Sequence, residues 1–315
     1  MFRGLNKCEA KICSDGWKLL VLGLVYFAVM FFGHLPDHLI LFPTRAPIDA
    51  GGAVRKTIAF ENGELEIWTT QSRRARQQDH ADVFILRFYG NADRADRSAA
   101  MEAEMWNDRA VEIWGMNYPG FGGSTGPARL SKIGPAALAV FDELERQAMS
   151  KSAVKSAVPS GSSSNPALRT AHATASIVLF GTSIGATAAL HVAAQRPIAG
   201  LILHNPVPLR EIILRQFGWW NLWLLAGPVA LQIPRDLDSI ANARASRAPA
   251  IFLLAEKDEI VAPRFHRLVF EAYAGEKSPI ALRGALHNDP IEGAALADLN
   301  DALDWLLGKS SLEKP

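Results

Sequence analysis

Hydrophobic positions form one long run near the N-terminus and a series of short runs further along the chain. The short runs predict strands covered on both faces, because a strand with one solvated face alternates apolar and polar residues; they are Val83–Phe88, Val111–Met116, Ser176–Phe180, Ile198–Leu203 and Ala250–Ala255. Segments with helical spacing separate or follow them: Ala95–Arg109, Pro135–Met149, Ser183–Gln195, Arg264–Ala274 and Ile291–Leu307. This alternation predicts an α/β fold with a mostly parallel central sheet and helices on both faces.

Turn-forming and polar residues mark the other divisions of the body. Lys56–Thr70 predicts a hairpin around Asn62-Gly63, a dipeptide that tolerates the positive φ of a tight turn. The polar segment Gln71–Ala81 is predicted to be a loop, and Pro279–Leu282 a short strand. Lys151–Ala175 is rich in Ser and Ala and has no apolar period, so we expect a flexible insertion there.

The long run, Leu19–Phe32, predicts a single membrane-spanning helix. By itself it is short for a span, which needs about 20 residues. Trp17, Lys18 and the uncharged Gly33–Leu35 extend it toward that length. A cleaved signal peptide is the first alternative, although no A-x-A-like cleavage site follows the run. A buried helix is the second.

Lys and Arg residues set the expected orientation of this helix. Four of them precede the run, and only Arg45 follows it closely; the four are Arg3, Lys7, Lys11 and Lys18. Positive residues stay on the cytoplasmic side of a span. We therefore expect a cytoplasmic N-terminus, with the domain that follows the helix outside the cytoplasm (periplasmic or extracytoplasmic).

The predicted organisation has five consecutive parts. They are a polar tail (1–16), a signal-anchor or transmembrane helix (17–35), a linker (36–52), the α/β domain (53–309) and a C-terminal tail (310–315). The domain contains the flexible insertion (151–175) and a cap-like region (206–247).

Composition excludes several classes of protein. The chain has 33 Lys and Arg against 32 Asp and Glu, a formal charge of +1, whereas nucleic-acid binders carry a basic excess. Its two cysteines, Cys8 and Cys13, both precede the apolar run. A disulfide-stapled scaffold and a Cys-based zinc site in the body are therefore excluded.

The segment Gly181–Gly185 reads G-x-S-x-G and lies between an apolar strand and a helical segment. A strand–turn–helix context is what this motif requires of a nucleophilic serine. The turn is too tight for side chains on both sides of the nucleophile, which explains the glycines. Ser183 is the predicted nucleophile. The N–H of Ile184, in the first turn of the helix, would face a developing oxyanion. An ordinary turn serine is the alternative.

A nucleophilic serine needs a base, and the base needs an orienting carboxylate. His287 is the best candidate base, since it follows the last short strand near the C-terminus. Asp258 is the preferred acid, because it follows the strand Ala250–Ala255 in an Asp-x-x-Val-x-Pro pattern. Of the other histidines, His191 is expected to pack within the nucleophile helix and His266 to lie on a basic helix surface.

Together these motifs resemble the α/β-hydrolase superfamily, and within it the branch of single-pass, membrane-anchored serine hydrolases. The resemblance covers about residues 17–308 and includes Leu39–Arg45 (L-I-x-x-P-x-R), Asn117–Gly126, Gly181–Gly185, Asp258 and His287. It implies an α/β-hydrolase fold with a small helical cap, and a Ser-His-Asp triad in the chain order Ser183, Asp258, His287. It does not specify the substrate.

This chain departs from the family pattern at two positions. The family's His-Gly-Asn after the third strand is Tyr89-Gly90-Asn91 here. The resemblance implies that the backbone N–H of Asn91 is the second oxyanion donor, and the lost His puts the support of that loop in question. The Asp that opens the family's second motif is Asn117 here, which leaves its bracing role open.

The cap-like region contains an unusually aromatic stretch, Phe217–Leu225. Its Trp219, Trp220 and Trp223 either pack a small helix against the body or form an acyl-chain pocket or a membrane-facing lid. Tyr89 and His204, which follow or end strands, are further candidates for the substrate pocket.

The sequence therefore predicts a membrane-anchored serine hydrolase that cleaves carboxylic ester or thioester bonds, of the esterase, lipase or thioesterase type. It needs no metal or organic cofactor. Its expected partners are a small-molecule or lipid ester and the membrane, with no nucleic acid, and the sequence leaves the oligomeric state open. A binding or scaffold protein with little turnover is the main alternative, and a serine peptidase a weaker one.

Overall fold

The computed structural model describes residues 5–32, 34–106, 108–157, 176–221 and 223–312. Within them, eight strands form one sheet in the order β1-β2-β4-β3-β5-β6-β7-β8. The strands are β1 (Val54–Phe60), β2 (Gly63–Gln71), β3 (Val83–Phe88), β4 (Val111–Met116), β5 (Ser176–Thr182), β6 (Gly200–His204), β7 (Ala250–Ala255) and β8 (Lys277–Leu282).

The sheet is antiparallel at one edge and parallel elsewhere. β1 pairs antiparallel with β2, and β2 antiparallel with β4. The pairs from β4 through β3, β5, β6 and β7 to β8 are all parallel. The expected mostly parallel sheet is confirmed, and the carboxyl ends of six neighbouring parallel strands meet at one edge. Ligands of open α/β sheets bind at this edge.

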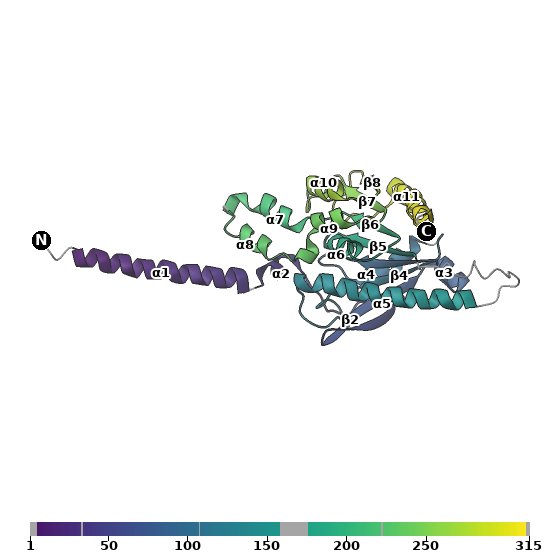
Figure 1. Cartoon of the computed structure of the whole chain (residues 1–315), viewed down its shortest axis with the longest axis horizontal. Coiled ribbons are helices and arrows are strands. Elements are labelled where there is room, and N and C mark those ends of the chain that lie inside the picture. The colour runs from purple at the N-terminus through teal and green to yellow at the C-terminus, as the bar shows by residue number, and fades with distance from the viewer. Residues whose placement is uncertain (1–4, 33, 107, 158–175, 222, 313–315) are drawn as a thin grey trace.

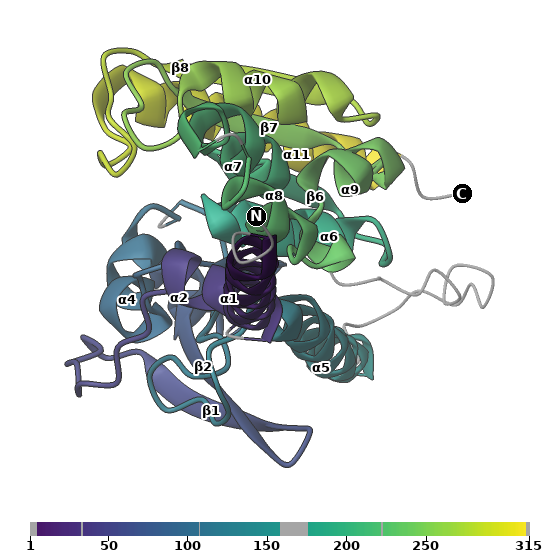
Figure 2. The ribbon, with the colours of Figure 1, turned by 90° about the vertical axis from the view of Figure 1, so that its left-hand side faces the viewer.

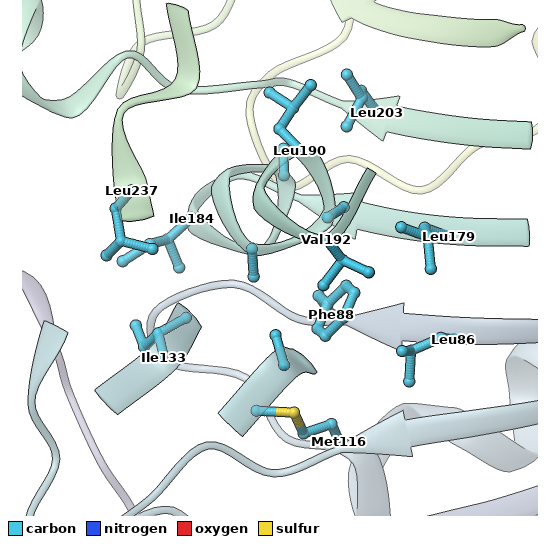
Figure 3. Close-up of a cluster of buried hydrophobic side chains, with 14 of the residues drawn as sticks. Leu86, Phe88, Met116, Ile133, Leu179, Ile184, Leu190, Val192, Leu203 and Leu237 are labelled. Atoms are coloured by element: carbon cyan, nitrogen blue, oxygen red, sulfur yellow. The ribbon is translucent and has the colours of Figure 1, made fainter. Parts of the chain in front are cut away.

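Helices cover both faces of the sheet (Figures 1 and 2). One face packs against α5 (Leu130–Ala157), α6 (Ile184–Ala193), α9 (Ser239–Ala245) and α10 (Pro263–Ala272). The other packs against α4 (Ala95–Glu104) and α11 (Gly293–Leu312). Figure 3 shows part of the larger core, where Leu86 and Phe88 of β3 and Leu179 of β5 lie against Val192 of α6. Burial on both faces is the reason that these strands are continuous apolar runs.

Several boundaries differ from the sequence prediction. The segment 71–81 was predicted to be a loop, but it contains α3 (Arg73–Gln78), which Ser72 caps by accepting a hydrogen bond from Ala75 N. The linker contains a short helix, α2 (Leu35–Ile40). α5 extends to Ala157, into the predicted insertion, and the rest of that insertion, 158–175, lies outside the described residues.

Helix α1 (Leu5–Phe32) projects from the sheet domain beside α7 (Leu209–Phe217) and α8 (Ala226–Leu231) of the cap-like region (Figures 1 and 2). It begins at Leu5, so part of the expected polar tail is helical. Gln232 donates a hydrogen bond to the carbonyl of Met30 at 2.5 Å, and the Tyr26 hydroxyl donates to Leu224 O. Among the residues that the structure describes, no helix combines the length and the hydropathy that a membrane crossing requires.

Candidate active site

Ser183 lies in the sharp turn between β5 and α6. Its backbone has φ 54° and ψ −120°, a conformation that L-residues rarely adopt. The flanking glycines permit the close approach that the turn requires. A Cβ on Gly181 would lie 2.5 Å from Gly185 O, and a Cβ on Gly185 would lie 2.2 Å from Phe88 O. A strained turn of this kind lifts a nucleophilic hydroxyl above the edge of the sheet.

The close contact at Gly185 also brings the start of α6 against the loop that follows β3. A Cβ on Gly185 would meet Tyr89 O at 2.6 Å as well, so Ile184 is next to the segment Tyr89–Asn91. The backbone N–H groups of Ile184 and Asn91 donate to no other group in the described part of the chain. An oxyanion hole is built from backbone N–H groups that have no internal partner.

Asp258 and His287 meet at the same edge of the sheet. His287 Nδ1 lies 2.5 Å from Asp258 Oδ2, and both side chains are buried. The other carboxylate oxygen, Oδ1, accepts hydrogen bonds from the N–H groups of Ile260 and Val261 at 2.9 and 2.7 Å. Burial alone would raise the pKa of Asp258, but hydrogen bonds from His266, His287 and Val261 N–H lower it overall. The carboxylate is therefore ionised and can orient the His287 ring.

Ser183 and His287 are both held by the turn that follows β6. Ser183 N donates to His204 O at 2.9 Å, and the Asn205 side-chain amide donates to His287 O at 2.9 Å. Asn205 itself has a positive φ of 48° and accepts a hydrogen bond from Ala255 N through Oδ1. The two candidate catalytic residues are thus each one hydrogen bond from the same two-residue segment. No hydrogen bond joins their side chains directly among the described residues. Such catalytic contacts are often long in ligand-free structures.

His266 is a residue that sequence reasoning misplaced. It was expected on a basic helix surface, but it is 1% exposed, and its Nε2 lies 2.8 Å from Asp258 Oδ2. Its Nδ1 lies 2.9 Å from Pro206 O. Its place in Pro263–Ala272, with apolar Phe265 and Val269 also buried, could have indicated an inward-facing position. His191 is buried, as expected.

The atoms of Asp258, His266 and His287 lie within 4.8 Å of one another, close enough in principle to surround a metal ion. The hydrogen bonds of both rings to one carboxylate oxygen account for that closeness. His204 lies beside this group and is also buried, with no partner for its Nε2 among the described residues. Burial, and then the positive charge of Arg87, lower the pKa of His204 to about 3, so the ring is neutral.

The loop Tyr89–Asn91 has support that replaces the family's missing histidine. The Tyr89 hydroxyl donates to Glu102 at 3.2 Å, and Tyr118 OH donates to Tyr89 O at 3.0 Å. The Asn91 amide donates to Ile40 O at 2.9 Å. Tyr89 is fully buried, so its ring braces the loop from the core. These bonds hold the loop, including the backbone of Asn91, in place.

Asn117 is the second position at which the chain differs from the family pattern, and its hydrogen bonds explain why an amide is present there. Its Oδ1 accepts from Ala95 N at 2.8 Å, and its Nδ2 donates to Glu66 Oε2 at 2.7 Å. Glu66 is buried and also accepts hydrogen bonds from Arg55 and from Gly123 N. An aspartate at position 117 could not donate to Glu66. This chain therefore braces the loop after β4 with an amide that joins β2 to the start of α4.

We expect Asn117→Asp to destabilise the protein by about 1–3 kcal/mol at neutral pH, because two buried carboxylates would face each other. The new carboxyl group would have a raised pKa in the folded state. The loss of stability relative to the wild type should therefore become smaller as the pH falls toward about 4. Thermal melting of the variant at several pH values measures this. Asn62→Asp, in the exposed hairpin turn, is the control. An unchanged melting temperature for Asn117→Asp would contradict the bracing role.

The cap tryptophans do not pack against the body. Trp219, Trp220 and Trp223 are 69%, 59% and 51% exposed. Most of the surface of these rings is therefore open to solvent, although the Trp223 indole N–H donates to Leu214 O of α7 at 3.1 Å. Other apolar side chains near them are also exposed: Leu214, Phe217, Leu224, Leu225 and Leu231. Together these eight residues, here named the cap patch, form an apolar surface next to α1.

No protein-family model matches the chain. It is similar to the uncharacterized protein Rv2307c of Mycobacterium tuberculosis, with 26% identity over 308 residues that cover 93% of this chain and 94% of that protein. A second uncharacterized protein of that species, MT2364, is 29% identical over 127 residues, 39% of this chain and 43% of its own.

Solved structures resemble the chain in fold. An esterase of Pyrococcus furiosus superposes with a TM-score of 0.58 at 13% identity, covering 86% of this chain and 98% of that one. An alpha-beta hydrolase of Vibrio vulnificus superposes with a TM-score of 0.54 at 16% identity, covering 83% and 82%. A membrane phospholipase A does so with a TM-score of 0.50 at 15% identity, covering 93% and 98%. At these identities the likeness shows the fold alone: the chain has an α/β-hydrolase fold.

Proposed function

We propose that the protein is a serine hydrolase that cleaves carboxylic ester or thioester bonds through Ser183, His287 and Asp258. The observation that carries the proposal is the buried hydrogen bond of 2.5 Å between Asp258 and His287, at the sheet edge where Ser183 occupies its strained turn. An esterase and a membrane phospholipase A are among the proteins of similar fold, which agrees with this chemistry, although the likeness to them is one of fold.

The proposed reaction begins when Nε2 of His287 takes the proton of the Ser183 hydroxyl, and Oγ attacks the carbonyl carbon of the substrate. The N–H groups of Ile184 and Asn91 stabilise the oxyanion. The tetrahedral intermediate collapses to an acyl-enzyme, and His287 returns the proton to the departing alcohol or thiol. Water, activated by the same ring, then releases the acid and regenerates Ser183.

Asp258 supports this cycle in two ways. Its hydrogen bond to Nδ1 of His287 keeps the proton on that nitrogen, so that Nε2 is free to act as the base. Its negative charge stabilises the imidazolium that forms during each proton transfer. Neither effect requires a hydrogen bond between the side chains of Ser183 and His287 before a substrate binds.

Labelling with a fluorophosphonate probe tests the proposal directly. We expect wild-type protein to be labelled at Ser183 and the Ser183→Ala variant not to be labelled, because the probe reacts only with an activated serine. Labelling at another serine, or none at neutral pH on folded protein, would contradict it. The second outcome would favour a binding protein with little turnover. One observation favours a binding protein: among the described residues, no hydrogen bond joins the side chains of Ser183 and His287.

We also propose that α1 and the cap patch attach the protein to a lipid membrane. The run Leu19–Phe32 leads directly to the cap through the contacts of Met30 and Tyr26. Several apolar side chains of α1 are exposed: Trp17, Leu19, Leu20, Leu22, Leu24, Val25, Phe27 and Val29. Apolar area this extensive, shared by two segments far apart in sequence, is typical of an interaction surface, and Trp favours the membrane interface. The positive residues before the run favour a cytoplasmic N-terminus.

Replacing Trp219, Trp220 and Trp223 by serine should lower the rate on an ester carried in lipid vesicles by about tenfold or more, since each buried Trp contributes on the order of 1 kcal/mol or more to membrane contact. The rate on a water-soluble p-nitrophenyl ester should not change. The ratio of the two rates is the measurement. Met101→Ser, at an exposed apolar residue of α4, is the control. An equal decrease in the hydrolysis rate on both esters would contradict a membrane role for the cap patch.

A further inference from the structure

Both ring nitrogens of His266 face groups that can only accept a hydrogen bond. Nδ1 lies 2.9 Å from the carbonyl oxygen of Pro206. Nε2 lies 2.8 Å from Oδ2 of Asp258. The ring is 1% exposed, so water cannot replace either partner. Both distances are those of ordinary hydrogen bonds.

A neutral imidazole has one N–H and one lone pair. In this setting, one of its nitrogens would point a lone pair at an oxygen lone pair inside the core. Unsatisfied contacts of this kind are costly where water is absent. Asp258 cannot supply the missing proton, because both of its oxygens already accept hydrogen bonds and its carboxyl group is ionised. Only the imidazolium form of His266 satisfies both contacts.

We propose that His266 is a buried imidazolium that shares Oδ2 of Asp258 with His287 and acts as a positioning residue for the catalytic pair. This role rests on the proposed function. It has two parts. The ion pair holds the carboxylate in the plane where Nδ1 of His287 meets it, and the positive charge opposes protonation of the His287 ring.

The other charged and titratable groups around His266 support a single imidazolium at this place. Asp258 comes from the loop after β7, His287 from the loop after β8, and His204 from the end of β6. His204 is neutral, because its pKa is about 3. Glu259 is exposed and reaches only the backbone N–H of His287. On α10 itself, Arg264 and Arg267 are exposed to water. Asp258 and His266 thus form a buried pair of opposite charge.

The sign of the effect on catalysis follows from this charge. His287 must be neutral to act as a base, and a nearby imidazolium makes it harder to protonate. Without the positive charge, the full attraction of Asp258 acts on His287, which then becomes protonated at higher pH. Loss of the imidazolium should therefore move the acid limb of the pH–rate profile upward. A neutral His266 would have no such effect.

The pH dependence of kcat/KM on a soluble p-nitrophenyl ester tests the proposal. His266→Gln keeps a hydrogen-bond donor and removes the charge. We expect its acid limb to lie about one pH unit higher than that of the wild type, with kcat lowered several-fold at the optimum. His191→Gln, at another buried histidine, is the matched control and should leave the acid limb unchanged. An unshifted limb in active, folded His266→Gln would overturn the proposal.

A second measurement does not depend on activity or on a variant that folds. Nitrogen-15 NMR of histidine-labelled, full-length protein in detergent micelles counts the protons on each ring. We expect both His266 nitrogens to carry a proton at pH 7–8. A single protonated nitrogen would overturn the proposal even if the protein were an active hydrolase. The protein could instead show two protonated nitrogens on His266 but no esterase activity. That result would support the buried imidazolium and overturn only the proposed function.

Discussion

Ser183→Ala is expected to lower kcat for ester hydrolysis by about 10⁴- to 10⁶-fold, since the members of a catalytic triad act as a unit and the rest of the site retains only a small residual rate. The Ser183 hydroxyl is the group proposed to form the covalent bond with the acyl carbon, whereas the neighbouring Thr182 hydroxyl accepts a hydrogen bond from Arg87. Its removal should leave substrate binding nearly intact, because the oxyanion donors are the backbone N–H groups of Ile184 and Asn91.

The measurement is steady-state hydrolysis of p-nitrophenyl esters of graded chain length, followed by thermal melting of each variant. Ser131→Ala, at an exposed serine of α5, is the control and should behave as the wild type. The Ser183→Ala variant should melt near the wild-type temperature, because alanine keeps the backbone angles of the turn without adding bulk. A variant that retained activity within tenfold of wild type would exclude Ser183 as the nucleophile.

Asp258→Asn is expected to lower kcat/KM by about 10³- to 10⁴-fold, because an amide cannot hold His287 in the tautomer that leaves Nε2 free. It should also lower the free energy of unfolding by about 1–3 kcal/mol. The reason is that the carboxylate accepts hydrogen bonds from four donors: Ile260 N, Val261 N, His266 Nε2 and His287 Nδ1. An asparagine would turn its NH₂ group toward two of them.

The stability difference between wild type and Asp258→Asn should depend on pH. The pKa of Asp258 is lowered in the folded protein, so its contribution to stability is present above the pKa of the unfolded chain, about 3.9, and is lost as the pH falls toward the folded value. The gap between the two melting temperatures should therefore narrow below about pH 4. Glu259→Gln is the control, since Glu259 is exposed and next in sequence. A constant gap would contradict the ionised carboxylate.

The interior strands show what local pattern can predict. Val83–Phe88, Val111–Met116 and Ala250–Ala255 were predicted with the boundaries that the structure has, because strands buried on both faces are apolar throughout. The prediction failed where a tertiary contact sets a boundary. α5 was expected from Pro135 but begins at Leu130, whose N–H donates to Asp37 of α2 at 2.8 Å. A cap from a residue so distant in sequence leaves no local signal.

In the candidate site, too, some features follow from local sequence and others from tertiary contacts. The G-x-S-x-G motif pointed to Ser183 because a strained turn needs glycine on both sides, which is a local requirement. The choice of Asp258 as the partner of His287 rested on order and spacing, and the structure places these two side chains within a hydrogen bond of each other. Their meeting with Ser183 near Asn205 depends on the pairing of β5, β6 and β7. Sequence spacing alone does not carry that information.

By itself, the sequence determined the alternation of strands and helices, the turn at Ser183 and the apolar run of α1. Each depends on residues a few positions apart, whose steric and hydrophobic preferences act locally. Only the tertiary structure decided that His266 is buried against Asp258, that Asn117 donates to Glu66 and that the cap tryptophans face outward. Burial and hydrogen-bond partners depend on which distant segments the sheet brings together, and a buried group takes its charge and its role from those partners.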